Sequence, residues 1–355
     1  LLAGRLPLWN PYTYGGHPFL ADIQAAVFYP ISNAVLLPTL PMTGAGARLY
    51  FLQIEAIIQI ALAGFFTYLL LRDLTGNRWA AFTGGLLFAF SGYLTGYPPV
   101  QLAVLRCAIW LPLMLWLLWR AYGQPSVWRW WIGAGLAYAA AFTAGHPQTF
   151  LHISYAMGAW MLFLLMAGLR SGAPARRKRA LQQVAGSAAL LLIAAGLSAA
   201  QALPSLEFAG LSVRAAVDYD FVSGGFPLQD TWQLLLPGIF TIYSPLYIGV
   251  VGLGLAVAGI TLLSDRHALG LLGTENGYRP ASARAVILFF AAFSLVALLL
   301  SYGSNAFLYP LFYRLAPGWN LFRGQERTAY LVAMGLTVLA GYGLAAVPLL
   351  SAHHR

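Results

Sequence analysis

The stretch LHISYAMGAWMLFLLMAGLRSGAPARRKR, residues 151–179, combines the two features from which the fold is inferred. Its first part, Leu151–Leu169, is mostly apolar and close to the length of about 20 residues that a helix needs to cross a bilayer. Its second part, Arg170–Arg179, is a dense cluster of basic residues. An apolar span that ends in basic residues is typical of a membrane helix with a cytoplasmic end.

The composition of the whole chain also indicates a membrane protein. Of the 355 residues, 60% are hydrophobic and 8% are charged, whereas soluble domains carry about 25% charged residues. So few charges cannot cover a surface that faces water, which excludes a soluble globular protein. The single cysteine, Cys107, lies in an apolar run, so the sequence holds no internal disulfide framework.

The expected fold class is all-α: a polytopic transmembrane helical bundle of about nine spans, with exterior loops and short interfacial helices. Helices are favoured over barrel strands because the apolar runs are continuous and do not alternate. The candidate spans are Leu49–Leu71, Trp79–Tyr97, Leu102–Trp119 (interrupted by Pro112), Trp130–Ala144, Leu151–Leu169, Val184–Leu203, Pro245–Leu263, Ala285–Leu300 and Tyr330–Leu350.

Charge counting assigns a side to each loop. Alternate loops collect most of the 20 Lys and Arg residues on one side, which the positive-inside rule makes cytoplasmic. Residues 1–48 are then an exterior loop with interfacial segments, and residues 49–350 form the transmembrane domain. Its exterior loops are about 204–244 and 301–327, and its cytoplasmic loops about 170–183 and 264–284.

The net charge of +10 is therefore a topology signal. Nucleic acid is not an expected partner, because the basic residues are not interleaved with aromatics on one face. The chain opens on Leu1 inside a loop, so we expect a fragment whose upstream spans are missing.

The opening stretch GRLPLWNPYTYGGHPFLADIQAAVFYP, residues 4–30, is the first candidate for a site. Its prolines and glycines favour turns over a long helix, and its aromatics suit a membrane interface. Alternatively the loop lines a site, with Trp9, Asn10 and His17 binding substrate and Asp22 acting as base or metal ligand. An acid in the first turn of a short helix would also simply favour the helix dipole.

A second motif, TAGHPQTFLH, spans residues 143–152. Gly145 ends one helix and Pro147 begins the next. The spacing of His146 and His152 matches neither a helical metal pair nor a zinc signature. We therefore expect His146 and Gln148 to line an exterior polar pocket.

A third motif, PGWNLFRGQERTAYLVAMG, covers residues 317–335 and precedes a strong span. Arg323 and Arg327 would sit at the exterior membrane edge, with Glu326 between them, if a helix begins near Gly324. Arginine suits bidentate phosphate recognition, and snorkelling of long basic side chains is the alternative. We favour an anion site formed by Arg323 and Arg327, with Glu326 as a further substrate-binding residue between them.

One ionisable group lies inside the first span. Glu55 has Gln59 one helical turn away, and Arg106 is a conceivable partner for its charge. Charges within a bilayer are costly, so we expect a structural ion pair.

Four segments, LPLWNPYTYGGHPFLADIQAAVFYP, AGHPQTFLH, LPSLEFAGLSVR and NLFRGQERTAY, together resemble the YfhO-type bacterial membrane proteins. These are similar to multi-span glycosyltransferases of the GT-C superfamily, and the resemblance covers essentially the whole chain. It implies a GT-C-like enzyme of the bacterial plasma membrane that acts on its outer face. The implied partners are the lipid bilayer, a lipid-linked (polyprenyl-phosphate) sugar donor and a cell-envelope glycan or lipid acceptor.

The implied chemistry is glycosyl transfer. A carboxylate takes the proton of the acceptor hydroxyl, and Arg323 and Arg327, or a divalent metal cation, balance the departing phosphate. The sequence departs from the family pattern, because the region that commonly carries the key acid would precede Leu1, so Asp22 is then a secondary acid. The competing interpretations are a transporter or flippase of lipid-linked saccharides, favoured by the helix break expected at Pro112, and a non-catalytic assembly factor.

Overall fold

The computed structural model describes residues 6–13, 15–41, 45–96, 101–170, 176–211, 217–240, 243–265, 269–270, 272 and 279–353. The early elements are β1 (Trp9–Asn10), β2 (His17–Pro18), η1 (Ile23–Ala25), α1 (Pro30–Leu36), η2 (Leu37–Thr39), α2 (Ala45–Thr75), α3 (Arg78–Ala89), α4 (Gly92–Thr95), α5 (Leu102–Ala108), α6 (Trp110–Gly123) and α7 (Trp128–Thr143). The later ones are α8 (Pro147–Arg170), α9 (Arg176–Gly210), α10 (Tyr219–Val222), η4 (Leu228–Leu234), α11 (Val250–Thr261), η5 (Leu262–Ser264), α13 (Ala283–Ser301), η6 (Gly303–Asn305), α14 (Leu308–Leu315), η7 (Gln325–Thr328) and α15 (Ala329–His353).

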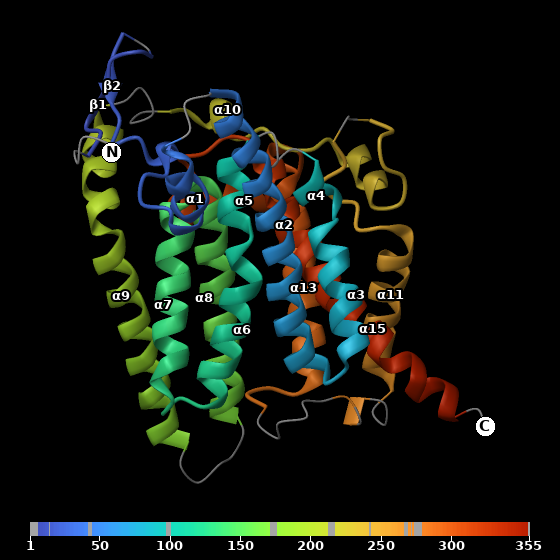
Figure 1. Cartoon of the computed structure of the whole chain (residues 1–355). Coiled ribbons are helices and arrows are strands. Elements are labelled where there is room, and N and C mark those ends of the chain that lie inside the picture. The colour runs from blue at the N-terminus through green and yellow to red at the C-terminus, as the bar shows by residue number, and fades with distance from the viewer. Residues whose placement is uncertain are drawn as a thin grey trace.

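The long helices run side by side and give the molecule two distinct ends (Figure 1). One end, called here the loop-rich end, carries the β1–β2 hairpin, α1, α4, α10 and the short elements between α13 and α15. The other end is called the basic end. It carries the short turns between α2 and α3 and between α6 and α7, the last turn of α8 and the first turn of α9. The helix turns that flank these connections contain five arginines: Arg72, Arg78, Arg120, Arg129 and Arg170. The loops that charge counting assigns to one side thus meet at one end.

The structure supports a multi-pass membrane protein with an all-α bundle. Six helical stretches are long and apolar enough to cross a bilayer: Leu49–Thr75, Leu102–Gly123, Pro147–Arg170, Arg176–Gly210, Ala283–Ser301 and Gln325–Val347. Helices α3 and α11 have 12 residues each and α7 has 16, which is short of the length of about 20 residues that a span requires. The expected number of nine spans is therefore not confirmed.

Two proline positions differ from the expectation. In place of the helix break expected at Pro112 there is only a one-residue interruption at Ile109, between α5 and α6, where the backbone dihedrals stay helical. Helix α9 continues through Pro204 to Gly210, beyond the expected span end at Leu203. Membrane helices tolerate proline where neighbouring groups satisfy the backbone.

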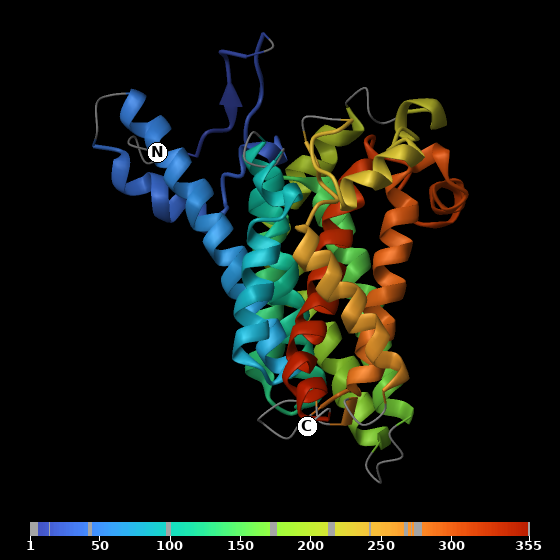
Figure 2. The ribbon, with the colours of Figure 1, turned by 90° about the vertical axis from the view of Figure 1, so that its right-hand side faces the viewer.

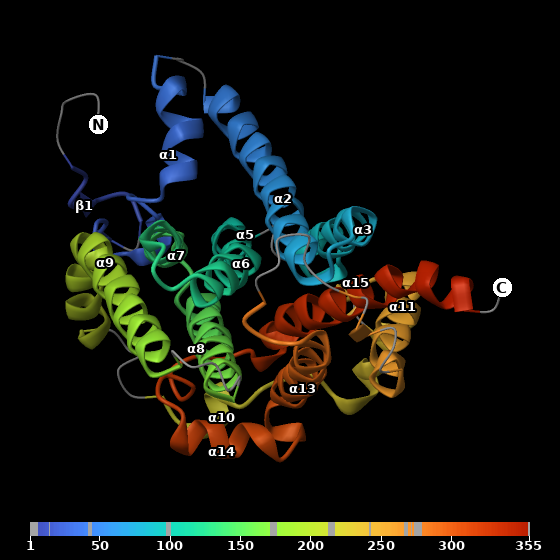
Figure 3. The same cartoon turned by 90° about the horizontal axis from the view of Figure 1, so that it is seen from below.

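The loops contain more regular structure than expected. Helix α9 begins at Arg176, so much of the expected cytoplasmic loop 170–183 is helical. The 301–327 region holds η6, α14 and the start of η7, while residues 266–268, 271 and 273–278 of the 264–284 loop lie outside the described residues. Figure 3 looks along the bundle and shows α14 lengthwise across its edge, as an interfacial helix would lie.

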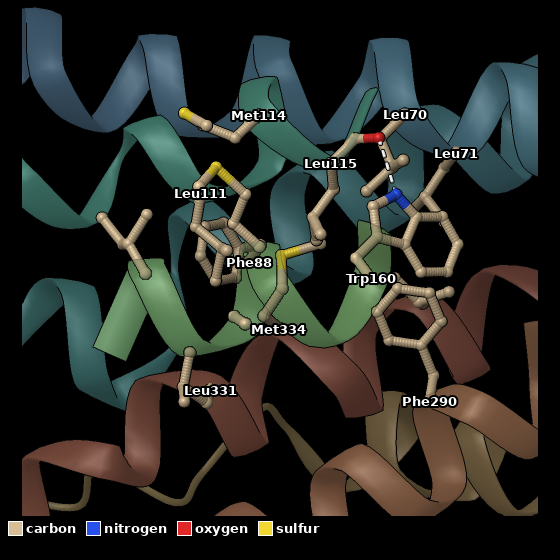
Figure 4. Packing of buried hydrophobic residues seen from close by; sticks show 14 of the residues in the cluster. Leu70, Leu71, Phe88, Leu111, Met114, Leu115, Trp160, Phe290, Leu331 and Met334 are labelled. Atoms are coloured by element: carbon tan, nitrogen blue, oxygen red, sulfur yellow. Dashed lines mark hydrogen bonds between the residues drawn. The ribbon is translucent and has the colours of Figure 1, made fainter. Parts of the chain in front are cut away.

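Helix packing in the core combines large aromatic side chains with close glycine contacts. Trp160 of α8 is fully buried, donates from Nε1 to the carbonyl of Leu115 at 3.1 Å and packs on Phe290 (Figure 4). Between α11 and α15 the backbones themselves touch, because a Cβ at Gly259 or Gly343 would overlap the carbonyl oxygen of Leu339 or Leu255. Such close approach of small residues is how membrane helices gain packing energy.

The predicted structural ion pair is confirmed. Glu55 accepts from Arg106 through both oxygens, at 2.6 Å from Nε and 2.8 Å from Nη2. Ser32 of α1 donates to the same carboxylate at 2.6 Å. The hydrogen bond from Ser32 therefore links α1 to α2. Figure 2 shows that α1 and the start of α2 lie apart from the other helices.

Candidate functional site

Two of the three predicted motifs meet at the loop-rich end. Gln148, in the first turn of α8, accepts a hydrogen bond from Arg327 Nη1 at 2.6 Å and donates from Nε2 to the carbonyl of Gly324 at 3.1 Å. These residues lie 179 positions apart in the chain. The first turn of α8 and the segment before α15 are thus in direct contact, and the binding roles of His146, Gln148, Arg323, Glu326 and Arg327 stay predictions.

The α7–α8 turn has the predicted form, with α7 ending at Thr143 and α8 beginning at Pro147. Gly145 adopts a φ of +92°, which glycine tolerates best, and a Cβ there would lie 2.6 Å from the carbonyl oxygen of Ile23. His146 Nδ1 accepts from the amide of Thr149 at 3.1 Å. His146 therefore caps α8 and is buried, so it contributes to the shape of the site.

The arginines lie on a backbone that is tightly held. Gln325 donates from its amide to the carbonyl of Gly224 at 2.8 Å and from Nε2 to that of Val222 at 2.9 Å. Gly324, with a φ of +78°, ends the preceding loop, and η7 begins at Gln325 as predicted. Arg323 is exposed and lies 5.5 Å above the ring of Phe221, whereas Arg327 is partly buried.

Glu326 follows Gln325 in the same turn and is also partly buried. In the sequence it lies between Arg323 and Arg327, so this segment carries one carboxyl group and two guanidinium groups.

A group of buried polar side chains lies beside these residues. His152 is 1% exposed, and within the described part of the chain neither of its ring nitrogens has a hydrogen-bond partner. Its ring lies 5.3 Å from that of Trp319 and 6.2 Å from that of Tyr330. Trp319 Nε1 and Tyr330 Oη are likewise buried without a partner among the described residues. We call these three residues the His152 cluster.

Buried polar atoms are nearly always hydrogen-bonded, so such a group marks a place where water or a ligand completes the contacts. The sequence analysis considered His152 only as half of a metal pair, which its spacing from His146 does not fit, and did not predict that it is buried beside Trp319 and Tyr330. A histidine in an apolar helix was the available signal. The sequence contains no signal that Trp319 and Tyr330 join this cluster, because their burial is decided only when the chain folds.

The opening segment lies at the same end, and its hairpin pairs Trp9 with Pro18 and Asn10 with His17. The hairpin projects from the bundle (Figure 1), and Trp9 is largely exposed. Asn10 Nδ2 donates to Thr13 Oγ1 at 3.0 Å, and this hydroxyl contacts His17 Nδ1 at 3.1 Å.

Asp22 is the N-cap of η1 and accepts from the amide of Gln24 at 2.9 Å through Oδ1. Its Oδ2 lies 3.7 Å from His17 Nε2. The short helix expected after Asp22 is thus a single turn, and it packs on Gly145, next to His146. The catalytic role of Asp22 and the binding roles of Trp9, Asn10 and His17 stay predictions.

A further acid, Asp230 of η4, is buried at the loop-rich end, and burial raises the pKa of its carboxyl. The sequence shows this acid in an exterior loop but not that it is buried. For metals, the described residues contain no group of three or more His, Cys, Asp or Glu side chains that could hold an ion.

Fold and site together define the class as a helical multi-pass membrane protein with a polar cluster at one end. No family model, curated protein or solved structure matches the chain.

Proposed function

We propose that the protein is an integral membrane glycosyltransferase of the bacterial plasma membrane. It takes a sugar from a polyprenyl-phosphate donor and transfers it to a cell-envelope acceptor on the exterior face. The observation that carries the proposal is the contact of Gln148 with Arg327, beside the His152 cluster and close in sequence to the exposed Arg323, at the end of the bundle opposite the basic end.

Positive charge at this end needs an explanation, because basic residues gather at the other end. Arg323 and Arg327 hold two permanently charged guanidinium groups at the mouth of α15, and guanidinium matches a phosphate in geometry and charge. The contact with Gln148 orients Arg327 before any ligand arrives, which lowers the entropy cost of binding.

The surroundings suit a lipid-linked ligand. Helix α14 lies across the bundle edge near this site (Figure 3) and exposes Leu311 and Leu315, while its Tyr309 is buried. An amphipathic helix of this kind rests in the membrane interface. A polyprenyl chain could therefore stay in the bilayer while its phosphate reaches the arginines.

The proposed reaction is a glycosyl transfer. The acceptor hydroxyl oxygen attacks the anomeric carbon, and the bond from that carbon to the phosphate oxygen breaks. Its electron pair leaves with the polyprenyl phosphate, whose charge Arg323 and Arg327 stabilise. Asp22 is the proposed proton acceptor, through the carboxylate oxygen that does not cap η1. Trp9 offers an exposed ring for the face of a sugar.

Binding of the donor's lipid phosphate tests the proposal. The full chain in nanodiscs is titrated with a fluorescent polyprenyl phosphate, and Arg323→Gln and Arg327→Gln are compared with wild type. Loss of one charge-assisted hydrogen bond costs about 1.5–3 kcal/mol, so each variant should bind roughly 10–100-fold more weakly. Arg314→Gln is the matched control, since Arg314 is an exposed arginine on α14 outside the cluster.

Unchanged binding by both variants would remove the arginines from the site and defeat the proposal. The same nanodiscs are then supplied with a radiolabelled polyprenyl-phosphate sugar and envelope lipid acceptors. Label in the acceptor supports the transferase. Movement of the intact sugar lipid across a proteoliposome membrane, without transfer, favours the flippase instead; the one-residue interruption at Ile109 is the feature that agrees with it.

A further inference from the structure

A groove at the basic end lies between the end of α8 and the start of α9, far from the site proposed above (Figure 1). Its volume is about 550 Å³, within the range of small-molecule sites. The groove is lined by Leu169, Arg176, Arg177, Ala180, Leu181 and Val184.

The two arginines of the groove are exposed. Within the described part of the chain, neither makes a hydrogen bond, an ion pair or a ring contact. Arg179, in the same turn, behaves differently: its Nη2 donates to the carbonyls of Tyr122 and Gly123 at 3.1 and 3.0 Å. Gln183 donates to Tyr122 as well, at 3.0 Å. The start of α9 is therefore fixed on the α6–α7 turn, and Arg176 and Arg177 are left for another ligand.

The walls of the groove are apolar and exposed. Leu169 is 45% exposed, Leu181 63% and Val184 55%. All three belong to helices that are long and apolar enough to cross the bilayer, so they face hydrocarbon while the arginines reach the headgroup region. A ligand that fits both parts carries an anionic group joined to apolar chains.

We propose that this groove binds an anionic phospholipid of the leaflet at the basic end. Its phosphate lies between Arg176 and Arg177, and its acyl chains lie along Leu181 and Val184. Basic pockets between transmembrane helices at the cytoplasmic side recognise such headgroups. A free phosphate would use the arginines but would leave the apolar walls without a role.

Native mass spectrometry of the full chain in detergent tests this inference. The protein is titrated with phosphatidylglycerol and, separately, with phosphatidylcholine, and bound lipids are counted. The Arg176→Gln/Arg177→Gln variant should bind phosphatidylglycerol about 30-fold more weakly, because two basic residues near an anionic surface together contribute about 2 kcal/mol. Phosphatidylcholine binding should not change. The variant Arg78→Gln/Arg129→Gln removes two charges from the same end outside the groove and should bind like wild type.

Equal retention of phosphatidylglycerol by the groove variant and wild type would overturn the proposal, as would an equal loss in the control variant. Glycerol 3-phosphate serves as a headgroup without chains. If it displaces the lipid at an equal concentration, the groove takes a soluble anion and the lipid assignment fails. The variant Leu181→Ser/Val184→Ser should also weaken phosphatidylglycerol binding, and no effect would remove the acyl chains from the groove. Thermal unfolding of each variant verifies that it is folded.

Discussion

Glu55 and Arg106 illustrate how single residues secure this bundle. Glu55 is fully buried, and its two oxygens receive hydrogen bonds from Arg106 and Ser32. The neighbouring Tyr29 donates to Gln59 at 3.1 Å and lies below the guanidinium of Arg106. A carboxylate away from water is tolerable only with such partners. The Glu55–Arg106 pair could be predicted from the sequence, because an ionisable group in an apolar span requires a partner. The contacts of Ser32 and Tyr29 with this pair could not.

Replacing Glu55 by Gln should destabilise the protein strongly. The substitution leaves the mostly buried cation of Arg106 without its counter-charge, and breaking a buried pair costs about 3–5 kcal/mol. Thermal unfolding followed by size-exclusion chromatography in detergent measures the loss.

The double variant Glu55→Leu/Arg106→Met removes both charges and should recover much of that stability. Ser32→Ala removes one hydrogen bond to the Glu55 carboxylate and should cost about 1.5–3 kcal/mol, less than the loss of the ion pair. A Glu55→Gln protein as stable as wild type would show that the charge contributes nothing.

At the scale of elements, helix packing depends on where glycines fall. Gly259 of α11 faces the backbone of α15, whereas Gly254 of the same helix has open space around its Cβ position. A glycine-to-alanine substitution can therefore be compared at a close backbone contact, Gly259, and at an open position, Gly254.

Gly259→Ala should therefore destabilise the α11–α15 contact by about 1–3 kcal/mol, because the added methyl forces the two backbones apart. Gly254→Ala should leave stability within about 0.5 kcal/mol of wild type. Thermal unfolding of both variants in the same detergent measures the difference, and equal stabilities would contradict the close contact.

The helices were largely predictable, because a span is defined by its own apolar composition. The short elements of the loop-rich end were not, because distant contacts define them. Gln325 reaches Val222 and Gly224, and a Cβ at Gly303 would overlap the carbonyl oxygen of Ser223. Helix α14 is too short to stand out in a pattern of apolar runs, although its exposed and buried faces are distinct once it packs.

At the scale of the whole molecule, the candidate site joins residues that the sequence could name but not bring together. Gln148 was expected to line an exterior pocket and Arg327 to form part of an anion site, and their contact arises only when folding brings the first turn of α8 beside η7. The His152 cluster was out of reach for the same reason, since an unpartnered buried atom exists only in the folded chain. This site and the basic end lie at opposite ends of the bundle, so the side of the membrane that each end faces can be measured separately.

Cysteine labelling should place the two ends on opposite faces of the plasma membrane. Cys107 is the single cysteine of the chain and is buried, so Cys107→Ala gives a background without a reactive thiol. On it, Tyr12→Cys introduces a thiol at a position that is 92% exposed on the hairpin, and Arg177→Cys introduces one at the basic end. A membrane-impermeant maleimide should label Tyr12→Cys in intact bacterial spheroplasts, but Arg177→Cys only after permeabilisation, because the positive-inside rule predicts that the basic end faces the cytoplasm. Labelling of both from outside would contradict the arrangement of the helices. The reverse pattern would place the Arg323–Arg327 site in the cytoplasm and exclude an exterior glycosyl donor.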